Sequence, residues 1–176
     1  MPDADFRKLY DTVFPILYRI ALRIAGGAQA AEDLCQDAFL KICEKNMVFP
    51  SLDDAKFWLI RVVKNAALNY AKRKERERVV YQKAFYNESR VTRTGEEELV
   101  RKETAQEVNE ALDALPKDMK VILVLTENGG LNYKEIGRIL GISEDNVKIR
   151  VFRARKKLQS ILEKQDGGIP CVRTNS

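Results

Sequence analysis

Residues 132–158 read NYKEIGRILGISEDNVKIRVFRARKKL, and this stretch decides the fold prediction. Asn132 and Glu135 have the spacing of a capping box at a helix start, although Asn stands in place of the usual Ser or Thr. Gly141 supplies the left-handed residue that a tight turn needs. Ser143 then caps a second helix, whose first turn is acidic, as the positive end of a helix prefers. The spacing predicts a helix-turn-helix.

The second of these helices carries a face that suits DNA. At about 100° per residue, its core side is apolar and comprises Val147, Val151, Ala154 and Leu158. We call the opposite side and its edge the basic face: Lys148, Ile149, Phe152, Arg153 and Lys156. In a major groove the cations bind phosphates or guanine edges, and the apolar groups touch thymine methyls. The alternative is an ordinary basic surface helix in a helical hairpin.

Composition and charge narrow the class of protein. Of the 176 residues, 32% are charged and 45% hydrophobic, a balance typical of a globular chain. The net charge of +5 is concentrated in residues 56–78 and 147–158, with an acidic stretch over 96–113 between them, which predicts two separate contact sites. No apolar run approaches the roughly 20 residues of a membrane span, and the N-terminus is no secretory signal. We therefore expect a cytoplasmic protein without membrane insertion.

Several kinds of chemistry are excluded. The chain has no histidine, which removes the commonest general base and every histidine-ligated metal site. It has no phosphate loop of the Gly-x-x-x-x-Gly-Lys kind. Its three cysteines, Cys35, Cys43 and Cys171, fit neither a disulfide framework nor a zinc site. We expect no enzyme activity, no cofactor, no metal and no catalytic residue.

Hydrophobic periodicity predicts an all-α chain of two small helical domains. The first would hold a helix up to Phe14, a second starting at Pro15 and ending at Gly26, and two more over about 30–45 and 53–78. The second would hold short helices and the helix-turn-helix. The predicted boundaries are 1–78 for the first block, 79–103 for a flexible linker, 104–164 for the second block and 165–176 for a tail. For residues 79–86, continuation of the preceding helix is an equal alternative.

Two helices of the first block carry candidate binding faces. On the helix over 53–78, the predicted core side comprises Leu59, Val62, Val63, Ala66 and Tyr70. We call its other side and edge the amide face: Phe57, Arg61, Lys64, Asn65 and Asn69. Amides among cations and aromatic rings can read base edges, although a solvated charged face is slightly favoured for this helix alone.

The helix over 30–45 has an acidic outer side instead of a basic one. Its predicted outer side, which we call the acidic face, includes Asp33, Gln36, Asp37 and Leu40. Acidic groups around an exposed leucine do not suit DNA, but they suit a basic protein partner. A solvated face with one stray leucine is an equal alternative.

With these residues together, the chain resembles bacterial RNA polymerase sigma factors of the extracytoplasmic-function (ECF) type over about residues 5–163. Residues 31–40 (AEDLCQDAFL) look like region 2.2, and residues 57–65 (FWLIRVVKN) look like regions 2.3 and 2.4. Residues 111–116, 133–137 and 147–155 look like region 4. The resemblance implies a region 2 helical bundle, a region 4 helix-turn-helix, and promoter-specific transcription initiation without enzyme activity.

The resemblance also implies a role for each face. The acidic face would dock on the clamp helices of the polymerase β′ subunit, and region 4 on the β flap. The amide face would capture the melted −10 element, with Asn65 at the base-reading position, and the basic face would read the −35 element as duplex. An anti-sigma factor would be a further partner. Gly137, Asn146 and Ile149 depart from the family's usual Ala, Thr and small polar residue, and the last bears on −35 preference.

A different class of function also fits a helix-turn-helix. A free-standing regulator, with the first block as a sensory or dimerising domain, would bind a specific operator as a purified chain. A sigma factor would bind its promoter specifically only with core polymerase.

Overall fold

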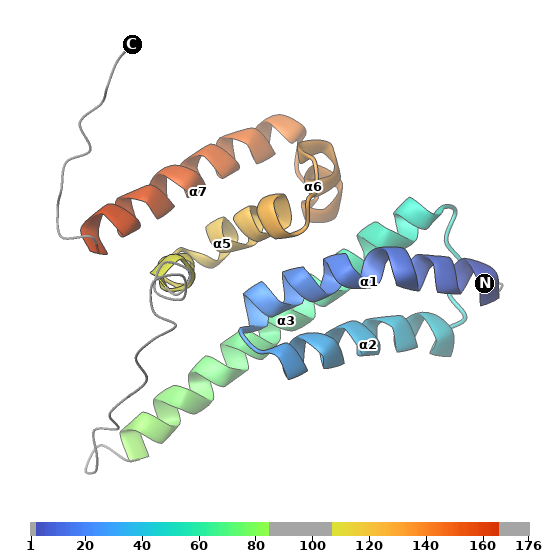
Figure 1. Cartoon of the computed structure of the whole chain (residues 1–176), viewed down its shortest axis with the longest axis horizontal. Coiled ribbons are helices and arrows are strands. Elements are labelled where there is room, and N and C mark those ends of the chain that lie inside the picture. The colour runs from blue at the N-terminus through green and yellow to red at the C-terminus, as the bar shows by residue number, and fades with distance from the viewer. Residues whose placement is uncertain (1–2, 85–106, 166–176) are drawn as a thin grey trace, which may run out of the picture.

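The computed structural model describes residues 3–84 and 107–165, and all regular elements in these ranges are helical (Figure 1). They are α1 (Asp3–Ala25), α2 (Ala28–Glu44), α3 (Leu52–Ala84), α5 (Lys117–Leu123), a π-helical turn η1 (Val124–Asn128), α6 (Tyr133–Leu140) and α7 (Glu144–Gln165). A further helical segment covers residues 107–113. The all-α prediction is confirmed. Within the described ranges, no helix is both long and apolar enough to cross a bilayer.

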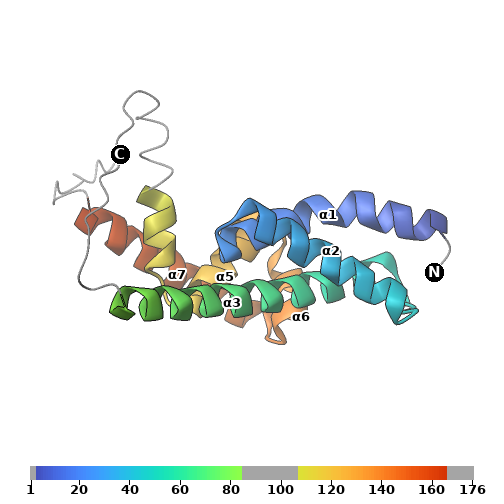
Figure 2. The same cartoon turned by 90° about the horizontal axis from the view of Figure 1, so that it is seen from below.

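The first block is a bundle in which α1, α2 and α3 all pack on one another. Its core is formed by side chains with almost no exposed surface: Leu9, Leu17 and Ile20 from α1, Cys35 and Ala38 from α2, and Leu59, Ile60 and Val63 from α3. The C-terminal end of α3 extends past the ends of α1 and α2 (Figures 1 and 2), and residues 72–81 are exposed. Here helix formation depends on local pairing rather than on packing, as in the ion pair of Arg78 with Glu75 at 3.0 Å.

The prediction that Pro15 begins a new helix is wrong, because α1 continues through it. Proline removes one N–H and crowds the preceding turn. Pro15 lies on the exposed side of α1, whereas Val13 and Leu17 on either side of it are buried in the bundle core. Burial of this continuous apolar face outweighs the local cost of the proline.

Residues 79–84 continue the preceding helix and do not begin the linker, because α3 extends to Ala84. The remainder of the predicted linker and the predicted tail after residue 165 lie outside the described residues. The domain boundaries therefore stay predictions.

The second block packs α5 and α6 against α7. Its core consists of apolar side chains that are almost fully buried: Ile122, Val124 and Leu125 before the turn, Ile136 and Ile139 in α6, and Val147, Val151 and Ala154 in α7. After Leu123, α5 widens into the π-helical turn η1. There the Thr126 hydroxyl donates to the Ile122 carbonyl at 2.7 Å, and the Gly129 N–H reaches back five residues to the Val124 carbonyl at 3.0 Å.

The two blocks lie against each other, with η1 contacting α1 and α6 contacting α3 (Figures 1 and 2). Gly129 lies at the first contact. A Cβ there would be 2.6 Å from the Leu125 carbonyl oxygen and 3.3 Å from Ile20 Cδ1 in α1. We call this packing the closed arrangement.

Candidate nucleic-acid interface

The helix-turn-helix forms as the sequence predicts. The Glu135 N–H donates to Asn132 Oδ1 at 2.9 Å, and the Asn132 N–H donates to Glu135 Oε2 at 2.9 Å, which completes the capping box. Gly141 adopts φ 70° and ψ 36°, in the left-handed region, and ends α6. The Asn146 N–H donates to Ser143 Oγ at 3.3 Å at the start of α7. These contacts fix the angle at which α7 leaves the turn.

The surroundings of Gly137 explain why glycine stands here in place of the alanine that the resemblance leads us to expect. A Cβ at this position would lie 2.7 Å from the Ile142 carbonyl oxygen, across the turn. A backbone oxygen cannot move aside as a flexible side chain can, so α6 approaches the turn more closely than an alanine would allow.

We expect Gly137→Ala to destabilise the chain. Crowding a well-packed site costs about 1–3 kcal/mol, and the better helix propensity of alanine returns about 1 kcal/mol. The expected result is a melting temperature lower by about 2–4 °C, measured by circular dichroism. Gly27→Ser is the control, since nothing lies within 4 Å of a Cβ there, its φ is −156°, and serine is favoured at the helix N-cap that Gly27 occupies. A variant at least as stable as the parent chain would contradict the close approach.

All five members of the basic face are exposed on α7. Phe152 is 68% and Ile149 47% exposed, although both are large apolar side chains. Lys148, Arg153 and Lys156 lie exposed on the same side of the helix, while Val147 and Val151 are buried beneath it. This combination leaves an apolar and cationic surface open to a ligand. The neighbouring Arg155 is held instead by Glu127 at 2.5 Å, and this hydrogen bond raises the pKa of the guanidinium.

Only part of the amide face is open to solvent, because other members of it contact the second block. Asn65 and Asn69 are exposed. Arg61 donates to the Ile139 and Arg138 carbonyls at 3.1 and 2.7 Å, at the C-terminal end of α6. Burial, and next to it the Arg61 charge, lower the pKa of the half-buried Lys64, while Asp118 opposes the shift.

The expectation that Phe57 lies on an exposed side is wrong, because it is only 8% exposed. Its ring carries the Arg138 guanidinium 4.8 Å from its centroid. The predicted core side was also too narrow, since Ile60 and Ala67 have no exposed surface. A helical wheel with one buried side fails for α3 because α3 packs on α1 and α2 in the first block and on α6 in the second.

Charged side chains join α3 to α6. Arg138 Nη2 lies 3.0 Å from Asp54 Oδ1, and Lys56 Nζ lies 2.9 Å from Glu135 Oε1. With Arg61, these residues form what we call the latch. Burial would raise the pKa of Glu135, but hydrogen bonds from Lys56 and the Asn132 N–H outweigh it and lower that pKa. Sequence patterns do not reveal the latch, because the capping box already accounts for Glu135 and no local pattern marks a partner 79 residues away.

The acidic face is exposed on α2. Asp33, Gln36 and Asp37 are open to solvent, and Leu40 is 54% exposed. Asp33 and Asp37 also line a groove of about 500 Å³ between α2 and α3, together with Asn69. The structure therefore brings the edges of the acidic and amide faces together.

The two thiols in the described residues differ in burial. Burial raises the pKa of Cys35 to about 12, whereas Cys43 is exposed. Within residues 3–84 and 107–165, no group of three or more Cys, Asp or Glu side chains could hold a metal ion.

We expect a thiol reagent at pH 8 to label Cys43 rapidly and Cys35 only on unfolding, because the thiolate is the reacting form. The measurement is the number of fast-reacting thiols in a Cys171→Ser chain, with one expected. Two fast thiols in the folded protein would contradict the burial of Cys35.

Comparison with known proteins finds a matching family model for each block. The family models "Sigma-70 region 2" and "Sigma-70, region 4" match residues 9–77 and 105–158. The ECF RNA polymerase sigma factor SigE of Mycolicibacterium smegmatis is 29% identical over 150 residues, covering 84% of this chain and 58% of the relative. The RNA polymerase sigma factor SigZ of Bacillus subtilis is 32% identical over 135 residues, covering 75% of this chain and 72% of the relative.

A solved structure is similar over most of the chain. It is the sigma factor RpoE from Bartonella quintana in complex with the anti-sigma factor NepR, with a TM-score of 0.61 and 27% identity. The similarity covers 90% of this chain and 97% of that one.

Proposed function

Because the chain belongs to the extracytoplasmic-function sigma factors of bacterial RNA polymerase, we propose that its three exposed faces divide the work of promoter recognition. Members of this family are transcription initiation factors rather than enzymes. They bind core RNA polymerase and direct it to promoters. The proposal concerns which residues of this chain meet each partner.

The basic face reads the −35 element as duplex DNA. The observation that carries this assignment is the exposure of Ile149 and Phe152 among three cations on one side of α7. Two large apolar groups exposed together mark a surface for a partner, and thymine methyls in a major groove provide apolar groups that can cover it. Lys148, Arg153 and Lys156 supply the contacts to phosphates and guanine edges.

The amide face reads the −10 element as a melted strand. Asn65 and Asn69 offer amide groups to an unstacked base, and Arg61 and Lys64 offer charge to the backbone. In the closed arrangement Arg61 and Phe57 are instead held against α6. Full use of this face therefore requires the blocks to separate, which the part of the predicted linker that follows Ala84 would permit.

The acidic face docks on the clamp helices of the polymerase β′ subunit, and the second block on the β flap. Leu40 supplies an apolar anchor at the centre of an acidic surface, the usual composition of a contact to a basic partner. Bound at two places, the blocks would be held apart at a fixed separation, and each weak DNA contact would raise the effective concentration of the other.

An anti-sigma factor is a further proposed partner, since the similar solved structure is a complex with one. Such a protein would act by covering the acidic or amide face. The proposed location is the cytoplasm, where the polymerase works.

Transcription with purified core polymerase tests the assignment. Run-off synthesis on a library of promoter sequences should show selection at −35 and −10 positions only when this chain and the core are both present. Equally specific operator binding by the chain alone would instead favour the free-standing regulator.

A further inference from the structure

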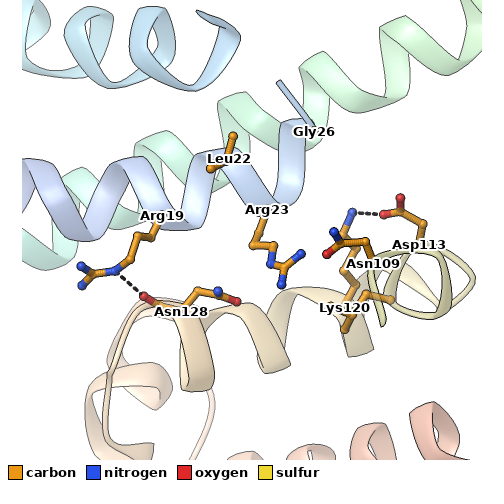
Figure 3. Close-up of a pocket in the computed structure, with 9 residues that line it drawn as sticks. Arg19, Leu22, Arg23, Gly26, Asn109, Asp113, Lys120 and Asn128 are labelled. Atoms are coloured by element: carbon orange, nitrogen blue, oxygen red, sulfur yellow. Dashed lines mark hydrogen bonds and ion pairs between the residues drawn. The ribbon is translucent and has the colours of Figure 1, made fainter. Parts of the chain in front are cut away.

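A cavity of about 420 Å³ lies where the two blocks meet (Figure 3), and its lining includes no residue of the latch. Its walls come from α1, the helical segment over 107–113, α5 and the end of η1. The polar residues that line it are Arg19, Arg23, Asn109, Asp113, Lys120 and Asn128. Both blocks therefore contribute to a single lining.

The lining has more positive than negative charge. Lys120 Nζ pairs with Asp113 Oδ1 at 2.6 Å, which neutralises the one carboxylate. Arg19 donates through Nε to the Asn128 carbonyl at 3.0 Å, and its guanidinium points away from Arg23 (Figure 3). Arg23 is half-buried, points into the space between α1 and the second block (Figure 3), and has no anionic partner in the part of the chain described. A partly desolvated cation in this setting favours an anion.

A second observation concerns Asn109. Its Oδ1 atom is buried and accepts no hydrogen bond from any described residue. Buried polar atoms are almost always paired, so an unpaired one inside a binding cavity marks a place for a donor. The cavity thus offers positive charge and one unused acceptor.

We propose that this cavity binds a small phosphorylated molecule of about nucleotide size. Its phosphate would lie against Arg23, because a guanidinium group matches the geometry of phosphate oxygens. A hydroxyl or amino group of the same molecule would donate to Asn109 Oδ1 once the side chains that cover this atom in the unliganded chain move aside. The volume is within the range of about 300–1,000 Å³ that is usual for small-molecule sites.

The site has a regulatory consequence. Because its walls come from both blocks, the ligand binds only the closed arrangement and shifts the population toward it. Bound ligand would therefore oppose the separation that the proposed function requires. The binding itself does not depend on that function and is tested without polymerase or DNA.

Thermal unfolding of the full chain tests the binding. The probes are sodium pyrophosphate, adenosine diphosphate and adenosine, each at several millimolar and compared with sodium chloride of equal ionic strength. We expect pyrophosphate to raise the melting temperature by about 3 °C or more, adenosine diphosphate to raise it further, and adenosine to have little effect.

Variants at Arg23 locate the site. Arg23→Gln should abolish the rise, and Arg23→Lys should reduce it because charge remains without the planar fork. Arg7→Gln is the matched control, since Arg7 is exposed on the same helix outside the cavity. No rise with pyrophosphate or adenosine diphosphate, or an equal rise in Arg23→Gln, overturns the proposal. No advantage of adenosine diphosphate over pyrophosphate overturns the contact to Asn109.

Discussion

Replacing Arg153 with alanine should lower transcription from a −35-dependent promoter by about 5- to 150-fold, while the affinity for core polymerase stays unchanged. A side chain that contacts a base edge is worth about 1–3 kcal/mol in discrimination, which corresponds to this range. Arg153 is exposed on the open side of α7 and forms no ion pair within the described residues, so its loss should not disturb the fold. The measurement is run-off transcription, with core binding followed separately by fluorescence anisotropy.

Two further variants test whether the Arg153 effect is specific to DNA recognition. Lys164→Ala removes an exposed cation from the last turn of α7, beyond the basic face, and should change transcription little. Gln36→Ala with Leu40→Ala should weaken core binding by about tenfold or more, because an exposed leucine at an interface centre is worth about 1–2 kcal/mol. If the Arg153 variant and the double variant lost core affinity equally, the division of labour between the faces would be refuted.

Local signals made the helix-turn-helix predictable. The capping box of Asn132 with Glu135, the left-handed Gly141 and the Ser143 cap each involve residues three or fewer apart, or a single residue. The five exposed members of the basic face followed from the helical period once the start of α7 was known. Sequence therefore predicts this candidate interface well, because the caps and the turn from which α7 starts are formed by short-range contacts.

The contacts between α3 and α6 could not be predicted in this way, because they join residues far apart in the sequence. The bonds from Arg61 to the α6 carbonyls span 77 and 78 residues, and the ion pair of Arg138 with Asp54 spans 84. No periodic pattern encodes such partners, so the amide face was expected to be open and Phe57 exposed. The prediction that a new helix starts at Pro15 was wrong for a related reason. A local rule predicts a helix break at proline, but burial of Val13 and Leu17 in the bundle core keeps α1 a single helix.

Reversing one charge of the latch should open the closed arrangement. In Lys56→Glu, two half-buried carboxylates would face each other where Lys56 Nζ and Glu135 Oε1 now lie 2.9 Å apart. Loss of a fully buried pair costs about 3–5 kcal/mol, and a partly exposed one less. We therefore expect the closed population to fall by about tenfold relative to the open one. Small-angle X-ray scattering should report a larger radius of gyration, with unchanged helical content by circular dichroism.

A second substitution separates electrostatic repulsion from unfolding. Glu135→Gln in the Lys56→Glu background removes the repelling charge, and glutamine can still serve the capping box, so the radius should return toward that of the parent chain. An unchanged radius in Lys56→Glu would mean that the ion pair contributes nothing to closure. The expected opening should also increase binding of a single-stranded −10 oligonucleotide, because Arg61 would leave the α6 carbonyls and become available to the strand. Closure and strand capture would then compete for the same arginine, and polymerase would favour capture by holding the blocks apart.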